Sequence, residues 1–295
     1  MTANLPPVRR TEVASDVSNL QLRNPWSWYP VVASADLNPG TLLPVVLNGE
    51  KLAVWRSSKG KVNAWHDRCP HRGMRLSFGA VNGETLICPY HGWTFGDDAR
   101  CVRIPAHPNV IPSRAARARL LPVAEVDGHI WICSGEPARS EPDADSTYTP
   151  VRTLHLQLGM EDAIVAFLTL PCAAGVKIQP PEDVDWSTSN TGAVVTRSET
   201  LTASFTLPSS IFCETTTETG KGKYLIRIQP TEPGGCAVQA SMTAGSDYVA
   251  FNRALVAFRA EIAQDKIKSW LRSAFSKFEA AVPVLVDGLT QGEAP

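Results

Sequence analysis

Two short segments of the chain each place a cysteine close to a histidine. The first, CPHRG, contains Cys69 and His71, and the second, CPYHGW, contains Cys88 and His91. Sixteen residues separate His71 from Cys88. Thiolates favour iron–sulfur chemistry, and two loops that each offer one thiolate and one imidazole suit a two-iron cluster with unequal ends. The spacing therefore predicts a [2Fe–2S] cluster in which the cysteines bind one iron and the histidines bind the other.

A structural zinc site is the main alternative, because it also uses two cysteines and two histidines. Zinc fingers usually pair cysteine with cysteine at one end and histidine with histidine at the other. The order Cys-His-Cys-His, with a single residue between Cys69 and His71, fits that arrangement poorly. Proline and glycine in both segments favour stiff, tight turns, as needed when backbone N–H groups point at sulfides. The iron–sulfur interpretation is therefore preferred.

The residues around these segments are typical of an all-β domain. Lys51–Arg56 and Val62–His66 alternate apolar and polar side chains on either side of Ser57–Lys61, which predicts a hairpin. Further short strands are expected at Thr85–Cys88, Trp93–Phe95 and His129–Cys133.

The length of 295 residues predicts two domains, each with enough material for a core of its own. We expect an N-terminal arm at 1–25, the all-β domain at 26–135, a linker rich in proline and acidic residues at 136–150, and a second domain at 151–295. The second domain has strand-like runs at Thr200–Leu207, Tyr224–Gln229 and Ala237–Met242, followed by a helical pattern over Tyr248–Ala280. The predicted fold class is α+β, with an antiparallel sheet and a C-terminal helix in the second domain.

Charge and hydropathy exclude several classes of protein. The chain has 28 Lys and Arg against 29 Asp and Glu, a balance that argues against coating nucleic acid or an anionic membrane. Its longest mostly apolar stretch, Ala163–Leu170, is too short to span a bilayer, and no apolar segment of an export signal follows Arg9 and Arg10. We expect a cytoplasmic protein without nucleic-acid or membrane partners. The seven cysteines are scattered and odd in number, so we expect the five outside the two segments to be buried thiols.

The stretch over residues 26–135 resembles the Rieske domain of the Rieske non-haem iron oxygenases, which hydroxylate rings or remove methyl groups. The segments CPHRG and CPYHGWTF carry the resemblance, together with Trp28–Val31 and the Ile130-Trp131 pair. Respiratory Rieske proteins are less similar, because they carry an additional cysteine in each loop where this chain has Met74 and Tyr90. The resemblance implies a lower-potential cluster that accepts electrons from a ferredoxin or a flavin reductase.

The same family carries a mononuclear Fe(II) in its second domain, held by two histidines and a carboxylate. The family motif is Asp-x-x-His-x4-His, with a later aspartate on a helix. At the matching place this chain has Asp162, but Val165 and Leu170 stand at the histidine positions, and Asp265 matches the later carboxylate. No histidine follows His155. The resemblance therefore implies a degenerate, truncated catalytic domain without mononuclear iron and without catalytic residues.

In the intact family, the aspartate of this motif links the cluster histidine of one subunit to the iron of its neighbour. Asp162 is thus a candidate electron-transfer bridge, although an exposed aspartate at a helix end is an equal alternative.

A surplus of positive charge surrounds the predicted cluster. Residues 40–120 contain twelve Lys and Arg but five Asp and Glu, and Arg68, Arg72 and Arg75 lie in or beside the first segment. A basic rim of this kind would steer an acidic electron donor to the cluster, although ordinary solubilising charge is the alternative.

These observations favour a Rieske subunit that passes single electrons to a homologous, iron-bearing oxygenase subunit in a mixed trimer or hexamer. One alternative is a structural or redox-regulatory pseudo-oxygenase subunit. Another is an oxygenase with an unrecognised iron site that hydroxylates or demethylates a small aromatic substrate.

Overall fold

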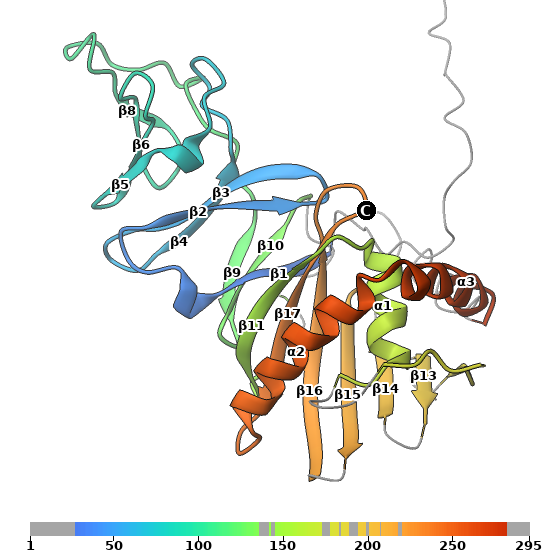
Figure 1. Ribbon diagram of the computed structural model, residues 1–295. Helices are drawn as coiled ribbons and strands as arrows, with labels where there is room; N and C mark the ends of the chain where they lie inside the picture. Colours follow the sequence, from blue (N-terminus) through green and yellow to red (C-terminus); the bar gives the residue numbers. More distant parts are fainter. Residues whose placement is uncertain are drawn as a thin grey trace, which may run out of the picture.

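The computed structural model describes residues 27–135, 142, 145–172, 178–182, 184–188, 194–198, 201–206, 208–217 and 220–281. The predicted arm at 1–25 lies outside these residues. The molecule is elongated, with small sheets at one end and a large sheet covered by helices at the other (Figure 1). None of the helices in the described ranges combines the length and apolar character needed to cross a membrane.

The N-terminal part consists of three small antiparallel sheets, as expected for an all-β domain. One sheet has the order β1-β10-β9, the second β2-β3-β4 and the third β5-β6-β7-β8. The predicted hairpin is confirmed, because β3 and β4 pair across Ser57–Lys61. The strands are β1 (Trp28–Ala33), β2 (Leu42–Leu47), β3 (Glu50–Arg56), β4 (Val62–His66), β5 (Ala80–Asn82), β6 (Thr85–Ile87), β7 (Thr94–Phe95), β8 (Cys101–Arg103), β9 (Val123–Val126) and β10 (His129–Cys133), with short 3-10 turns η1 (Ser34–Asp36) and η2 (Leu76–Phe78).

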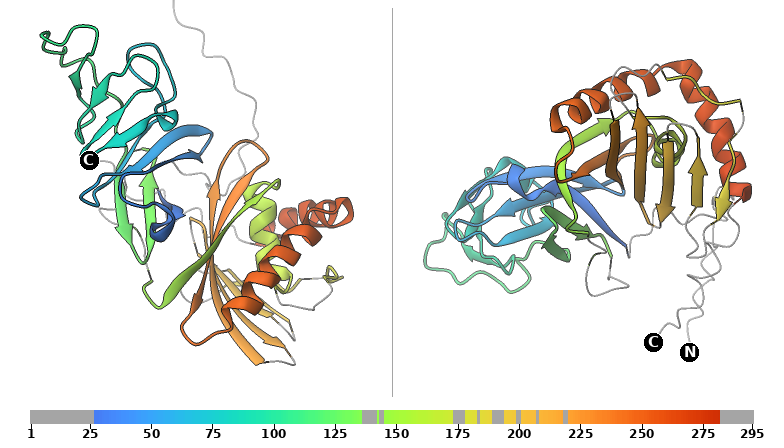
Figure 2. Two further views of the ribbon diagram at one scale, coloured as in Figure 1. Left: turned by 60° about the vertical axis from the view of Figure 1, so that its left-hand side comes forward. Right: turned by 90° about the horizontal axis from the view of Figure 1, so that it is seen from below.

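The second part is a seven-stranded antiparallel sheet with the order β11-β17-β16-β15-β14-β13-β12. Its strands are β11 (Tyr148–Leu156), β12 (Ser187–Thr188), β13 (Val194–Arg197), β14 (Leu201–Thr206), β15 (Ser210–Thr217), β16 (Gly220–Pro230) and β17 (Cys236–Thr243). Three helices lie on one face of this sheet (Figure 2). They are α1 (Met160–Thr169), α2 (Tyr248–Ile262) and α3 (Asp265–Ala281). The α+β class predicted from the sequence is confirmed, while β11 begins at Tyr148, inside the stretch expected to be linker.

The helical pattern over Tyr248–Ala280 forms two helices rather than one. The buried positions follow three- and four-residue steps as far as Ile262, but the next buried apolar residue is Ile267, five residues later. A continuous helix would turn that side chain about 140° away from the previous one. Because the chain breaks between α2 and α3, both Ile262 and Ile267 face the core.

The large apolar core contains residues from both parts of the molecule. Residues of β1, such as Tyr29, belong to the same cluster of buried side chains as Leu154 of β11 and Ile226 of β16. A second cluster, around Trp55 and Trp65, underlies the two cysteine–histidine segments. The two domains are therefore bound into one body, and the segments rest on a core of their own.

A buried charge network joins the domains beside this shared core. Asp127, in the turn between β9 and β10, forms an ion pair with Arg227 of β16 at 2.7 Å, and both side chains are almost fully buried. The other carboxylate oxygen of Asp127 lies 3.3 Å from His129 Nδ1 and accepts a hydrogen bond from Trp131 Nε1 at 3.2 Å. The guanidinium of Arg227 also lies over the Trp131 ring. His129 is thus a hydrogen-bonded structural histidine.

Candidate metal centre

The first cysteine–histidine segment is a tight turn closed by its own backbone. The N–H of Cys69 donates to the carbonyl of Met74, and the N–H of Gly73 donates to the carbonyl of Cys69, both at 2.8 Å. Gly73 has a φ of +72°, which L-residues rarely adopt. The glycine therefore allows the chain to turn back beneath His71.

The second segment repeats this geometry. The N–H of Cys88 donates to the carbonyl of Trp93 at 2.9 Å, and the N–H of Gly92 donates to the carbonyl of Cys88 at 3.1 Å. Gly92 has a φ of +67°. A Cβ there would also lie 3.0 Å from Pro105 Cγ. The two loops are thus structural equivalents, each with its cysteine at the first position and its glycine at the fifth.

Gly92→Ala is expected to lower the free energy of unfolding by about 2–3 kcal/mol, because it combines a left-handed backbone with a close approach to Pro105. Gly83→Ala is the matched control. Gly83 also has a positive φ of +60°, but a Cβ there meets nothing within 4 Å, so we expect a loss of only about 1–2 kcal/mol. Denaturant unfolding measures both values, and equal losses would contradict the assigned contact with Pro105.

The four predicted ligands divide into a buried pair and an exposed pair. Cys69 and Cys88 are each 2% exposed and belong to the cluster around the two tryptophans. Burial, together with the adjacent Cys88, raises the pKa of the Cys69 thiol to about 11. His71 and His91 are exposed, and their ring centroids lie 4.7 Å apart. Thiols therefore occupy the inner side of the site and imidazoles the outer side.

A neighbouring ring fixes the orientation of His71. The imidazole stacks on the indole of Trp93, with ring centroids 4.4 Å apart and planes 5° from parallel. Desolvation lowers the pKa of His71, and the charges of His91 and Arg72 lower it further. A neutral imidazole is the form that binds a metal, so this environment favours ligation.

This donor set fits a [2Fe–2S] cluster. Two thiols on one side and two imidazoles on the other would hold such a cluster, which would supply single-electron transfer. Within the described ranges no three His, Cys, Asp or Glu side chains gather closely enough to hold a single metal ion.

The three arginines proposed for donor docking are not equivalent. Arg68 and Arg72 are exposed. Arg75 instead donates from Nε to Asp67 at 2.8 Å, and its guanidinium also lies over the Phe78 ring. The positive charge of Arg75 is therefore partly neutralised, and the exposed charge beside the site comes mainly from Arg68 and Arg72.

Asp67 is the supporting residue that spacing alone did not reveal. Its carboxylate is fully buried and accepts from the backbone N–H and the hydroxyl of Ser77, each at 2.6 Å, as well as from Arg75. These bonds fasten the start of the first loop to η2. The only sequence signal was an acidic residue two positions before Cys69.

Asp67→Asn is expected to lower the free energy of unfolding by about 2–3 kcal/mol, because charge-assisted bonds in a buried place are lost. Asp97→Asn removes the carboxylate of an exposed pair, Asp97–Lys61, and should cost less than about 1 kcal/mol. Thermal and denaturant unfolding of both variants measure the difference. A cost for Asp67→Asn no larger than that of the control would contradict the role assigned to Asp67.

The residues aligned with the mononuclear iron motif lie on or near α1. Val165 and Leu170 are completely buried in the shared core. Asp162 is half-buried in the first turn of α1, and its pKa is raised by burial despite the charge of Arg272. Asp265 is exposed at the start of α3. The charges that act on the pKa of Asp162 are those of Arg272 and Glu161.

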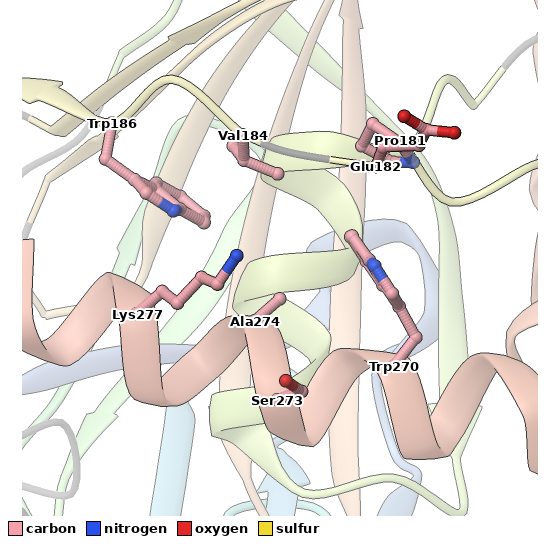
Figure 3. A pocket seen from close by; sticks show the side chains of 8 residues that line it. All are labelled: Pro181, Glu182, Val184, Trp186, Trp270, Ser273, Ala274 and Lys277. Carbon is pink, nitrogen blue, oxygen red and sulfur yellow. The ribbon is translucent and has the colours of Figure 1, made fainter.

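The cavity between α3 and the segment around Trp186 is small. It has a volume of about 30 Å³, enough for about one water molecule. Figure 3 shows Lys277 of α3 extending between the indoles of Trp186 and Trp270. Phe258, on the inner side of α2, packs against Phe167 with ring centroids 4.7 Å apart. Phe258 and Trp270 are therefore packing residues.

The remaining cysteines also match their predicted role. Cys101, Cys133, Cys172, Cys213 and Cys236 are buried, and none of them forms a disulfide among the described residues. Burial raises the pKa of both Cys172 and Cys213 far above the usual range, since each is enclosed by apolar side chains. They are packing residues in this structure.

Comparison with known proteins identifies the first part of the chain. The family model of the Rieske [2Fe-2S] domain matches residues 27–121. Oxidoreductase NdmD of Pseudomonas putida is 43% identical over 111 residues, which are 37% of this chain and 19% of that protein. Chlorophyllide a oxygenase of Chlamydomonas reinhardtii is 42% identical over 118 residues, which are 39% of this chain and 18% of that protein. The similarity thus spans about a fifth of the length of these relatives.

Solved structures resemble the chain over nearly its whole length. NdmA of Pseudomonas putida CBB5 superposes with a TM-score of 0.63 and 20% identity, covering 92% of this chain and 97% of NdmA. Apo dicamba monooxygenase superposes with a TM-score of 0.59 and 21% identity, covering 88% of this chain and 97% of that one. Residues 27–121 are therefore a Rieske [2Fe–2S] domain, joined to a second domain in the fold that NdmA and dicamba monooxygenase share.

Proposed function

We propose that this chain is the Rieske subunit of a multicomponent non-haem iron oxygenase that performs no oxygenation itself. When bound, the [2Fe–2S] cluster supplies single-electron transfer, and Cys69, Cys88, His71 and His91 hold it. The electron donor is a ferredoxin or a flavin reductase, and the acceptor is the mononuclear iron of a homologous partner subunit in a mixed trimer or hexamer.

One observation carries this proposal. The first domain has a complete set of cluster ligands. At the places where the family motif has histidines, this chain has Val165 in α1 and Leu170 directly after it, and both side chains are fully buried. Valine and leucine offer no donor atom, and Asp162 alone is a poor site for Fe(II).

The shape of the molecule supports transfer to another chain. The first cluster loop lies between β4 and η2 and the second between β6 and β7, and β5 to β8 are at the end of the molecule opposite α1 and α3 (Figures 1 and 2). His71 and His91 are exposed at that end, so their imidazole edges are accessible to a partner. Asp162, on α1, would then face the cluster of a neighbouring chain rather than its own.

A catalytic oxygenase is the second candidate. It is favoured by the superposition on NdmA, which covers 97% of that chain. This candidate requires an iron site that differs from the family motif, completed by another chain or by ligands outside the described residues.

The experiment tests the chain alone for oxygenation. The chain is purified anaerobically, reduced, and exposed to O₂ with caffeine or dicamba as probes, the compounds bound in other solved structures of NdmA and dicamba monooxygenase. We expect no oxidised product from the chain alone. Product formation by the isolated chain would overturn the proposal in favour of the catalytic oxygenase.

A variant of one cluster ligand distinguishes electron transfer from a purely structural role. His71→Cys leaves three thiolates and one imidazole, and is expected to lower the reduction potential of the centre by roughly a hundred millivolts, because four-cysteine clusters lie well below Rieske centres. In the assembled complex we expect turnover to be lost while the subunits stay together. Unchanged turnover, measured with the same reductase, would instead indicate that the chain only supports the assembly.

A further inference from the structure

A cleft between the two domains lies apart from the cluster loops. It has a volume of about 700 Å³ and is lined by β1, η1 and β2 on one side and by β11 and the β16–β17 turn on the other. Backbone hydrogen bonds join the adjoining turns, from Asn48 N–H to the carbonyl of Pro230 at 2.9 Å and from Gly49 N–H to that of Thr231 at 2.8 Å. The two walls are therefore held together, and a cleft of this volume can accept a small organic molecule.

Gln229 lines this cleft and carries a buried hydrogen-bond acceptor that has no partner among the described residues. Gln229 of β16 is 2% exposed, and its Nε2 donates to the carbonyl of Val46 at 2.5 Å. That bond orients the amide and leaves Oε1 free, with no hydrogen-bond partner among the described residues. A buried acceptor in this state costs free energy, and a donor on a bound molecule would satisfy it.

Two carboxylates and one imidazole line the cleft. Asp36 of η1 and Glu232 of the β16–β17 turn contribute carboxylates from opposite walls, and His155 of β11 contributes an exposed imidazole, whereas none of the described lining residues is lysine or arginine. The other lining side chains are mainly apolar, including Val31, Leu43 and Leu156. Such a lining suits a ligand that has a positive N–H group and an apolar body.

We propose that this interdomain cleft binds a small organic ammonium ion, with its N–H groups directed to Gln229 Oε1 and to the carboxylates of Asp36 and Glu232. Because both domains contribute to the site, the bound ligand stabilises their mutual arrangement. The inference does not depend on the electron-transfer role of the chain.

The test uses benzylammonium as the probe, with benzyl alcohol and benzoate as neutral and anionic controls. Calorimetric titration of the cluster-loaded protein is expected to show binding of benzylammonium, weaker binding of benzyl alcohol and none of benzoate. The melting temperature should rise with benzylammonium concentration, since a ligand that binds only the folded state stabilises it. Absence of benzylammonium binding, or equal binding of the alcohol, would overturn the proposal.

Matched carboxylate variants locate the binding site. Glu232→Gln and Asp36→Asn are each expected to weaken benzylammonium binding by about three- to fivefold, as for exposed charge pairs. Both residues are exposed, so the variants should fold normally. Glu182→Gln changes an exposed carboxylate at the separate α3 cavity and should leave binding unchanged. Equal weakening by Glu182→Gln would show that only the overall charge matters, and would contradict the assigned site.

Discussion

The Cys88→Ser chain is expected to fold but to be purified without iron or acid-labile sulfide. Cys88 is 2% exposed, and with Cys69 it supplies the thiolate end of the centre. A serine hydroxyl is a much harder and less acidic donor than a thiol, so one iron loses half of its protein ligands. We expect the visible absorption and the EPR signal of the reduced cluster to disappear, together with nearly all bound iron.

Cys101→Ser provides the matched control for this result. Cys101 is also a buried thiol of the cluster around Trp55 and Trp65, but it lies in β8 outside the two loops. The control should retain its full iron and sulfide content. Equal loss of iron in both variants would mean that damage to the core, rather than loss of a ligand, removes the cluster.

Arg227→Met is expected to lower the free energy of unfolding by about 3–5 kcal/mol, the largest loss that we predict for a single substitution outside the metal loops. The change leaves the carboxylate of Asp127 buried without its ion-pair partner, at the junction of the two domains. The double variant Arg227→Met with Asp127→Asn should recover part of the loss, because the uncompensated charge is then absent.

Lys223→Met is the control for the loss of a positive charge. Lys223 pairs with Glu214 on the same sheet, but both side chains are more than half exposed, so we expect a cost below about 1 kcal/mol. Denaturant unfolding of the variants at neutral pH gives the comparison. Similar costs for Arg227→Met and Lys223→Met would contradict the role of the buried network as the joint between the domains.

The same network makes stability depend on pH in the acid range. Burial opposes ionisation of Asp127, but the hydrogen bond from His129 and the charge of Arg227 outweigh it, and the pKa of Asp127 is lowered. A carboxyl whose folded pKa is depressed contributes stability above its unfolded pKa of about 3.9 and loses it as the pH falls through the folded value. The stability advantage of the wild type over Asp127→Asn should therefore be constant at neutral pH and shrink below about pH 4, as measured by unfolding across that range.

Local patterns predicted the elements that residues near in sequence determine. The alternation in Val62–His66 predicted the bounds of β4, and the paired cysteine and histidine spacing predicted the two equivalent loops within the Rieske domain. The break after Ile262 was also visible as a five-residue step, although the overall periodicity suggested one helix.

Features built from distant residues could not be predicted in this way. Asp127 and Arg227 are one hundred positions apart in the chain, and no local periodicity links them. The same is true of the shared core, which brings β1 against β16. The support of the first loop by Asp67 depends on the fold of η2 and on Arg75, so only the structure reveals it.

The content of iron and acid-labile sulfide per chain tests the central claim most directly. The protein is purified anaerobically, incubated with excess ferrous iron and freed of unbound metal before analysis. A cluster without a mononuclear site predicts about two irons and about two sulfides per chain. About three irons with two sulfides would show that the chain binds mononuclear iron after all, and would contradict a role limited to electron transfer.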